Sequence, residues 1–370
     1  MTDDANDDQR DGQRDDDDEP DEFERKLEEG WQALERGDRA LARRIADEAV
    51  ATPDAGGDQP ERSPEQMAPA LLLLAACFRE DGDHDHAIPL LRQAAKADPE
   101  WCTPELWLAE LLAVQPETTA EARRHAARAL DLADEEAEYL SSLALKAGLE
   151  AELGEVDEAK ETLQDLPAPD VSLGDPMLAL EIAELWLAIG EPAQARDRLA
   201  TLTGSDPDMA DAWYTLGIAC EELDDSEGMR AAWKKSWQLD ARADDADFAV
   251  RLDERELAAV AESALGELPA RARALLRDVP IVISDLPAEA DIESGLDPRV
   301  LGLFAGTPHP EISHVGGQPG LTQILLFRRN LERSAASEDD LRQEIRTTLL
   351  HETGHFFGMD ENDLEKVGLD

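Results

Sequence analysis

The stretch that decides the fold is DMADAWYTLGIACEELDDSEGMRAAWKKSWQLD, residues 208–240. Its apolar residues recur at intervals of three and four on both sides of a short acidic turn, which is the spacing of two amphipathic helices. The residues that mark this helix pair are Trp213, Leu216 and Gly217 on the first helix and Trp233 and Ser236 on the second. We expect the tryptophans at these offsets to be core residues rather than ligand contacts.

The same helix pair recurs along the preceding part of the chain. The residue that marks the second helix of each pair recurs every 34 to 45 positions, at Ala42, Ala87, Ala122, Ala159, Ala195 and Met229. A period near 34 residues with two helices per repeat is the tetratricopeptide spacing, and these segments resemble tetratricopeptide repeats over about 220 residues. The resemblance implies a helical solenoid with a concave surface that binds another protein or a peptide.

Composition divides the chain into three parts. Residues 1–22 are acidic and almost without apolar side chains, so we expect a disordered tail. Residues 23–245 carry the repeats, and the Pro/Gly/Asp-rich residues 51–69 explain their one long interval as a loop insertion. Residues 246–370 lose the repeat pattern. We therefore expect a multidomain chain, in which an all-α tetratricopeptide-like helical solenoid is followed by a small α+β domain.

The last part of the chain predicts a mixture of helices and short strands. Amphipathic spacing predicts helices at Phe248–Leu265 and Ala270–Arg277. Short β-branched or apolar runs predict strands at Val279–Ser284, Val300–Ala305 and Leu321–Arg328. The Gly/Pro/His-containing residues 306–320 are expected to form a loop between the last two strands.

The chemistry-bearing residues lie on a final helix. Ser337, with Asp340 three positions later, predicts the start of a helix that continues into HETGH, residues 351–355. Because positions i and i+4 lie on one face of a helix, His351 and His355 can offer two imidazole nitrogens to one cation. Glu352 lies beside them, where a carboxylate can accept a proton from a water molecule at the metal.

Two histidines leave a catalytic zinc ion one protein ligand short. Glu361 lies six positions after His355, which on a continuous helix would turn it away from the metal. Gly358 predicts that the helix stops in a left-handed turn, so that Glu361 can point back toward the metal. The alternatives are other side chains that bind metals: Asp360 and Asp363 in the same turn, and His309 and His314 in the preceding loop.

The spacing HExxHxxGxxE resembles the metzincin motif, and residues 246–370 resemble the small zincin-like metallopeptidases described as minimal matrix-metalloprotease-like domains. The resemblance rests on the ordered segments LGELPARARALL, VPIVIS, LGLFAGTP, ILLFRRNLE and RTTLLHETGHFFGMDENDL. It implies bound Zn²⁺ held by His351, His355 and Glu361, with Glu352 as the catalytic base. It also implies that residues 324–327 form an edge strand, against which an extended peptide substrate pairs.

Three functional interpretations follow from these residues. The first is a zinc peptidase whose water nucleophile is deprotonated by Glu352, with the repeat array recruiting a protein or peptide. The second is a non-catalytic repeat scaffold with a zinc-stabilised C-terminal domain. The third is that HETGH is incidental on a core helix. Arg328 and Arg329 could assist an oxyanion, although we expect them to be surface residues.

The net charge, the apolar runs and the cysteines indicate which partners and which cellular compartment to expect. The 86 acidic and 35 basic residues give a net charge of −51, which opposes binding to nucleic acid or to an anionic membrane. Such a Lys-poor, acidic surface suits either a high-salt or an ordinary cytoplasm. The longest apolar run, Met67–Phe78, is shorter than the roughly 20 residues that span a bilayer. The three widely spaced cysteines and the absence of an apolar leader predict a cytoplasmic protein. Nothing in the sequence indicates an oligomeric state.

Overall fold

The computed structural model describes residues 21–51, 62–244, 248, 250–306, 322–360 and 363. The chain divides into two compact units, Met1–Leu166 and Pro167–Asp370. Among the described residues, the first contains helix pairs and one short 3₁₀ helix, and the second contains further helix pairs followed by a small domain with a β-sheet.

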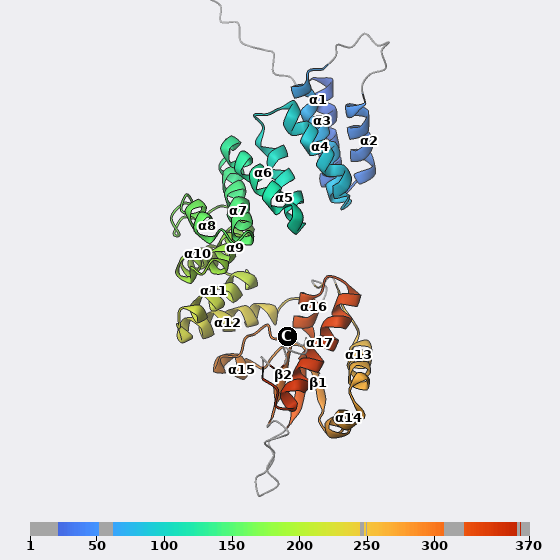
Figure 1. Cartoon of the computed structure of the whole chain (residues 1–370), viewed down its shortest axis with the longest axis vertical. Coiled ribbons are helices and arrows are strands. Elements are labelled where there is room, and N and C mark those ends of the chain that lie inside the picture. Colours follow the sequence, from blue (N-terminus) through green and yellow to red (C-terminus); the bar gives the residue numbers. More distant parts are fainter. Residues whose placement is uncertain are drawn as a thin grey trace, which may run out of the picture. The chain divides into compact units, whose positions relative to one another are not determined.

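The described part of the first unit is built from four helix pairs (Figure 1). Their helices are α1 (Glu22–Glu35), α2 (Arg39–Val50), α3 (Pro64–Glu80), α4 (His84–Ala97), α5 (Cys102–Ala113), α6 (Thr119–Leu132), α7 (Glu136–Glu152) and α8 (Val156–Leu163). A short 3₁₀ helix, Pro116–Thr118, lies between α5 and α6. Consecutive helices pack against one another along the whole series, so each pair buries its apolar stripe against its neighbours.

Two more pairs open the second unit. Their helices are α9 (Pro176–Ala188), α10 (Pro192–Ser205), α11 (Ala210–Glu222) and α12 (Ser226–Asp240). All six marker residues lie on the second helix of a pair and are buried. Except between α5 and α6, the turn within a pair places one residue at positive φ, such as Gly82 at 71° and, in the last pair, Asp224 at 58°. The expected repeat array is confirmed.

The structure shortens two of the irregular segments expected from composition. Helix α1 begins at Glu22, because Asp21 and Glu24 form a reciprocal capping box. Helix α3 begins at Pro64, capped by Ser63 and Gln66, so the loop predicted for residues 51–69 extends too far at its C-terminal end. Proline is accepted in the first turn of a helix, where its missing N–H has no intrahelical partner to lose. Residues 1–20 and 52–61 lie outside the described residues.

The rest of the second unit is the small α+β domain. Its helices are α13 (Glu254–Glu267), α14 (Ala270–Leu276), α15 (Glu289–Ser294), α16 (Arg328–Ser334) and α17 (Glu338–Phe356). Its strands are β1 (Ile281–Ser284), β2 (Gly302–Ala305) and β3 (Gln323–Phe327). All three predicted strands are present. Helix α13 starts later than predicted, because Asp253 caps it. Helices α15 and α16 were not expected from the sequence pattern.

The sheet has the strand order β1-β3-β2. Strand β3 pairs in parallel with β1 and antiparallel with β2. The prediction that residues 324–327 form an edge strand is therefore wrong, because β3 is central and both of its sides are paired. Local sequence does not reveal strand order, since pairing partners are set by contacts distant in the chain. Among the described strands, β1 and β2 are the edges.

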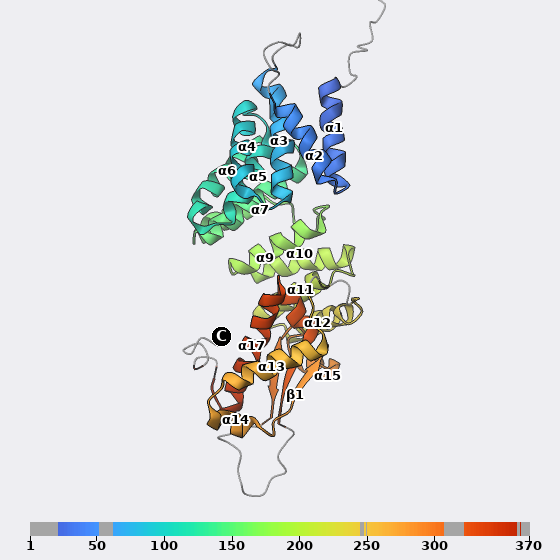
Figure 2. The same ribbon diagram turned by 90° about the vertical axis from the view of Figure 1, so that its right-hand side faces the viewer.

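Two helices cover the sheet. Helix α13 packs against α17, and α17 packs against β2 and β3 (Figure 2). Ile324 and Leu326 of β3 are fully buried in the same core as Leu257 of α13 and Ile345 of α17. This core fixes α17, and with it the HETGH residues, against the sheet.

A buried carboxylate joins the last helix pair to this domain. Asp240, at the end of α12, is 4 % exposed and accepts hydrogen bonds from Arg299 at 3.3 Å and Arg333 at 2.6 Å. Arg329 donates to the backbone carbonyls of Asp240 and Ala243. Because burying an ion pair is favourable only when its geometry is good and its other polar groups are satisfied, these bonds fix α12 against α16.

Cys77, Cys102 and Cys220 are buried and form no disulfide with one another. None of the described helices combines the length and the hydropathy needed to cross a bilayer.

Candidate metal centre

The position of the histidines on α17 is fixed because the apolar face of this helix is buried in the core. The Ser337 hydroxyl accepts from the Asp340 N–H and starts the helix as predicted. Leu341, Ile345 and Leu349 then follow the apolar stripe of α17 and have no exposed surface. Phe356 continues this stripe near the end of the helix, where its ring contacts Phe304 of β2 edge-to-face. The HETGH residues are therefore held on a rigid, well-packed helix.

The two histidine side chains converge. The Nε2 atoms of His351 and His355 lie 3.0 Å apart, and the two rings are 77° from coplanar. Two nitrogens bound at about 2.0–2.1 Å to one tetrahedral zinc ion would lie about 3.3 Å apart. The spacing and the chemistry of this donor pair thus fit a zinc ion, as the i, i+4 spacing predicted.

The helix ends as Gly358 predicted. Gly358 has φ 79°, and its N–H donates to the His355 carbonyl, while the Met359 N–H donates to the Gly354 carbonyl. This is the Schellman pattern of a helix C-terminus. The turn brings the Met359 carbonyl 3.1 Å from Nδ1 of His355. A proton on Nδ1 would donate to that carbonyl and leave the Nε2 lone pair for a metal, which is the arrangement common around metal-binding histidines.

Glu352 lies between the helix and the sheet. Its side chain is buried, and its Oε2 atom accepts the backbone N–H of Phe304 at 2.6 Å. Phe304 belongs to β2, and the antiparallel register shows which way its N–H points. The Leu301 carbonyl accepts the Phe327 N–H, and in an antiparallel pair only alternate residues bond to the partner strand. Leu301 and Leu303 therefore face β3, whereas the backbone N–H of Phe304 points to the outer edge of β2. Glu352 therefore lies at the outer edge of β2.

Gly302 is a positioning residue that the sequence analysis missed. A Cβ atom added at Gly302 would lie 2.6 Å from Cγ2 of Thr348 and 3.1 Å from Cγ of Glu352. The missing side chain lets α17 approach β2 closely enough for the Glu352–Phe304 hydrogen bond. A glycine inside a predicted strand was the available signal, because it often marks a close backbone approach.

The structure brings the two histidines together but adds no third ligand from the described residues. Within them, no group of three or more His, Cys, Asp or Glu side chains is placed to hold a metal ion. Asp360 accepts the backbone N–H of Asp363 at 2.9 Å. Glu361, His309 and His314 lie outside the described residues.

Arg328 and Arg329 have structural partners. The Arg328 guanidinium pairs with the buried Glu332 and with Asp285. Arg329 donates to backbone carbonyls at the end of α12 and in the turn that follows, as described above. Neither arginine is the solvated surface residue that we expected, because each is used to fix α16 in place.

Comparison with known families identifies two parts of the chain. The family described as zincin-like metallopeptidase matches residues 276–369, which contain β1 and everything after it. The tetratricopeptide repeat family matches residues 68–100, which contain most of α3 and all of α4. No curated protein sequence matches the chain.

Several solved structures of repeat proteins are similar to the chain. PilW, a type IV pilus biogenesis factor, is 16% identical and has a TM-score of 0.48, with 60% of this chain and 94% of PilW covered. A thermophilic tetratricopeptide protein of Thermus thermophilus is 20% identical and has a TM-score of 0.39, with coverages of 54% and 99%. The chain thus joins an array of tetratricopeptide-like helix pairs to a C-terminal segment that matches the zincin-like metallopeptidase family.

Proposed function

We propose that the protein is a zinc-dependent peptidase whose helical repeats bind a protein or peptide. The observation that carries this proposal is the convergence of two imidazole Nε2 atoms, 3.0 Å apart, on a helix that also carries the buried carboxylate Glu352. The match of residues 276–369 to zincin-like metallopeptidases supports the same reaction class.

In this proposal His351, His355 and Glu361 hold the zinc ion. A zinc ion, when bound, polarises a carbonyl group and makes a coordinated water molecule more acidic. The hydrogen bond of His355 to the Met359 carbonyl fixes the ring that binds the metal. Glu361 follows the left-handed turn at Gly358, and a carboxylate there would complete three protein ligands while leaving a fourth position open.

Glu352 acts as the general base. Its carboxylate takes a proton from the attacking water and passes it to the leaving amine of the cleaved peptide bond. The bond from the Phe304 N–H orients the carboxylate at the outer edge of β2. An extended substrate would pair with this edge, in place of the β3 edge expected from the sequence, and would bring its backbone next to Glu352.

The repeat array is proposed to recruit the partner or substrate. In the first unit, a cavity of about 780 Å³ lies beside α1 and the start of α3, and its lining includes Phe23, Leu27 and Trp31. Glu24, Glu28, Glu35 and Glu65 share this lining. Aromatic side chains supply binding energy in such surfaces and carboxylates select for positive charge, so the first unit suits a basic segment with an apolar anchor.

The test compares wild type with Glu352→Gln for zinc content and for cleavage of a mixed peptide library. Glutamine keeps the size of the side chain but removes its basic carboxylate. The proposal expects about one zinc per chain in both proteins and a 10²–10⁴-fold loss of hydrolysis in the variant, the range typical of a lost general base. Glu344→Gln, two turns earlier on α17, is the matched control and should cleave like wild type.

A second candidate function has an observation of its own in its favour. Glu352 is bonded to the backbone of β2, and a buried carboxylate used in this way can be a structural prop. The second candidate is therefore a repeat scaffold whose C-terminal domain is stabilised by zinc and does not cleave. It predicts no cleavage by wild type, and a lower melting temperature for Glu352→Gln at unchanged zinc content.

A further inference from the structure

Strand β1 is the second edge of the sheet, remote from the edge at which Glu352 lies. Ile324 of β3 donates to the Pro280 carbonyl, and Ile281 is the register partner of Ile324. In a parallel pair, alternate residues bond to the neighbouring strand, so Val282 faces β3 while Ile281 and Ile283 point their N–H and C=O groups outward. Within the described residues, these outward groups have no hydrogen-bond partner.

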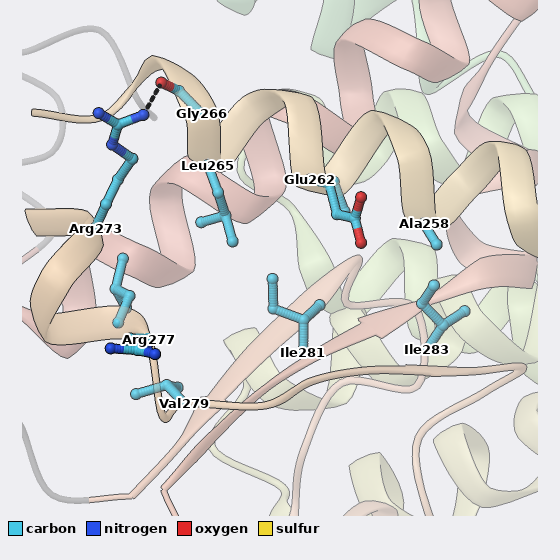
Figure 3. A pocket seen from close by; sticks show the side chains of 11 residues that line it. Ala258, Glu262, Leu265, Gly266, Arg273, Arg277, Val279, Ile281 and Ile283 are labelled. Atoms are coloured by element: carbon cyan, nitrogen blue, oxygen red, sulfur yellow. Dashed lines mark hydrogen bonds between the residues drawn. The ribbon is translucent and has the colours of Figure 1, made fainter. Parts of the chain in front are cut away.

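A pocket of about 440 Å³ lies beside this edge, and its lining is mainly apolar, with Glu262 of α13 and two arginines as its charged residues. Figure 3 shows Ile281 and Ile283 pointing from β1 toward α13, which carries Ala258 and Leu265 on the opposite wall. Both isoleucines are only partly buried, because α13 packs on α17 and leaves this gap over the edge of the sheet. The pocket thus adjoins unpaired backbone groups, which is the combination that accepts an added strand with alternating side chains.

The end of the pocket nearest the start of β1 is basic. Residues 268–277 contain three arginines and no acidic residue, in a chain whose net charge is −51. Arg273 donates to the Gly266 carbonyl and closes one end of the pocket (Figure 3). Arg277 also lines the pocket, is exposed, and makes no hydrogen bond or ion pair with any described residue. A ligand with negative charge at this end would give Arg277 a partner.

We propose that the outer edge of β1 is a docking site for an extended peptide segment that alternates apolar and small polar residues and ends in acidic residues. The segment adds to β1 as a fourth strand, bonding to the outward groups of Ile281 and Ile283. One of its apolar side chains enters the pocket under α13. We place the segment antiparallel to β1, so that its acidic C-terminal end reaches Arg277, which precedes β1.

This site does not depend on the proposed peptidase activity. It lies on β1, whereas Glu352 is bonded to β2 on the other side of the central strand. A second copy of the chain is a poor occupant on charge grounds, since two polyanions of −51 repel each other before their edges can meet. The same repulsion acts on any acidic ligand and grows with its charge, so the occupant is a separate segment with only a few acidic residues, all at the end that meets Arg277.

The probe is the peptide Gly-Thr-Val-Thr-Val-Ser-Asp-Glu, labelled at its N-terminus with fluorescein and carrying a free C-terminal carboxylate. Binding is measured by anisotropy on the full chain carrying Glu352→Gln, so that cleavage cannot remove the probe. We expect saturable binding. A control peptide with the uncharged Asn-Gln-amide in place of Asp-Glu should bind about fivefold more weakly, given the worth of exposed ion pairs.

Two substitutions test the pocket and its charge. Ala258→Leu fills the pocket from α13 and should weaken binding about tenfold, which corresponds to about 1.4 kcal/mol. Ala259→Leu, on the next and exposed position of the same helix, is its matched control and should bind like the parent. Arg277→Glu should weaken binding about fivefold, whereas Arg255→Glu, an exposed residue of α13 that does not line the pocket, should not.

Hydrogen exchange distinguishes strand addition from simple charge attraction. The probe should slow exchange of the Ile281 and Ile283 amides and leave Val282, which already faces β3, unchanged. Binding without this protection, or binding that Ala258→Leu does not weaken, would overturn the proposal. So would protection of Ile281 and Ile283 in the protein without probe, because the edge would then be occupied by a second copy.

Discussion

Trp233 packs so closely over Gly217 that a Cβ atom added at Gly217 would lie 2.0 Å from Cδ1 of the indole. The two residues face each other across α11 and α12, and Trp233 is 3 % exposed. A helix glycine normally costs stability, but here its missing side chain sets how near the two helices approach. Gly217 and Trp233, two of the five residues that marked this helix pair in the sequence, therefore contact each other in the structure.

Gly217→Ala should destabilise the second unit by about 1–3 kcal/mol, because the indole cannot move without disturbing a filled core. Gly204→Ala is the control. It also lies in a helix, but nothing is within 4 Å of its added Cβ, so it should stabilise by about 0.5–1 kcal/mol. Chemical denaturation measures the change in the free energy of unfolding for each of the two variants. Equal effects would show that helix propensity, and not the approach of Trp233, governs position 217.

Asp240→Ala should lower stability by about 1.5–3 kcal/mol, because it removes the buried one of the two carboxylates that pair with Arg299 and Arg333, the other being the exposed Asp211. Asp208→Ala, an exposed position before α11, should be nearly neutral. Thermal unfolding followed by tryptophan fluorescence measures both. A neutral Asp240→Ala would mean that α12 and α16 stay together without the carboxylate.

Gly302→Ala should impair the proposed reaction without removing the metal. The new methyl group would press on Thr348 and Glu352, moving the carboxylate from the edge of β2. A displacement of about 1 Å in a catalytic group can lower rates about a hundredfold, so kcat should fall far more than KM rises. Zinc content should stay near that of wild type. Gly266→Ala on α13, with no atom near its added Cβ, should leave kcat unchanged.

Removal of zinc should destabilise the C-terminal domain. Ligand binding to the folded state stabilises it by about 2.7 kcal/mol at a free concentration one hundred times Kd. A chelator should therefore lower the melting temperature of wild type, and re-addition of zinc should restore it. His355→Ala should melt at the same temperature with and without chelator. If that variant still gains stability from zinc, the metal binds elsewhere.

The sequence predicted what depends on local patterns. Helix pairs follow from apolar spacing, and the stop at Gly358 follows from the one residue that takes positive φ easily. The meeting of His351 and His355 follows from helix geometry alone. These features need no knowledge of which segments pack together.

Features set by contacts between distant segments were missed. The order β1-β3-β2 places the third strand in the middle, although nothing in residues 323–327 distinguishes a central strand from an edge strand. Arg328 and Arg329 were expected to be surface residues because their partners are distant in the sequence. Arg329 bonds to the end of α12, and Arg328 pairs with Asp285, which follows β1. Gly302 matters only because α17, more than 30 residues later, returns to lie on it.

The shared carboxylate of Asp240 also bears on how such a chain could evolve. Its helix belongs by pattern to the repeats, yet its charge neutralises arginines of the domain that follows. A recombination event that exchanged the array at residue 245 would separate Asp240 from Arg299 and Arg333. Both parts would then fold less well. The unit that can be inherited intact therefore includes α12, and repeats are most easily gained or lost nearer the beginning of the array.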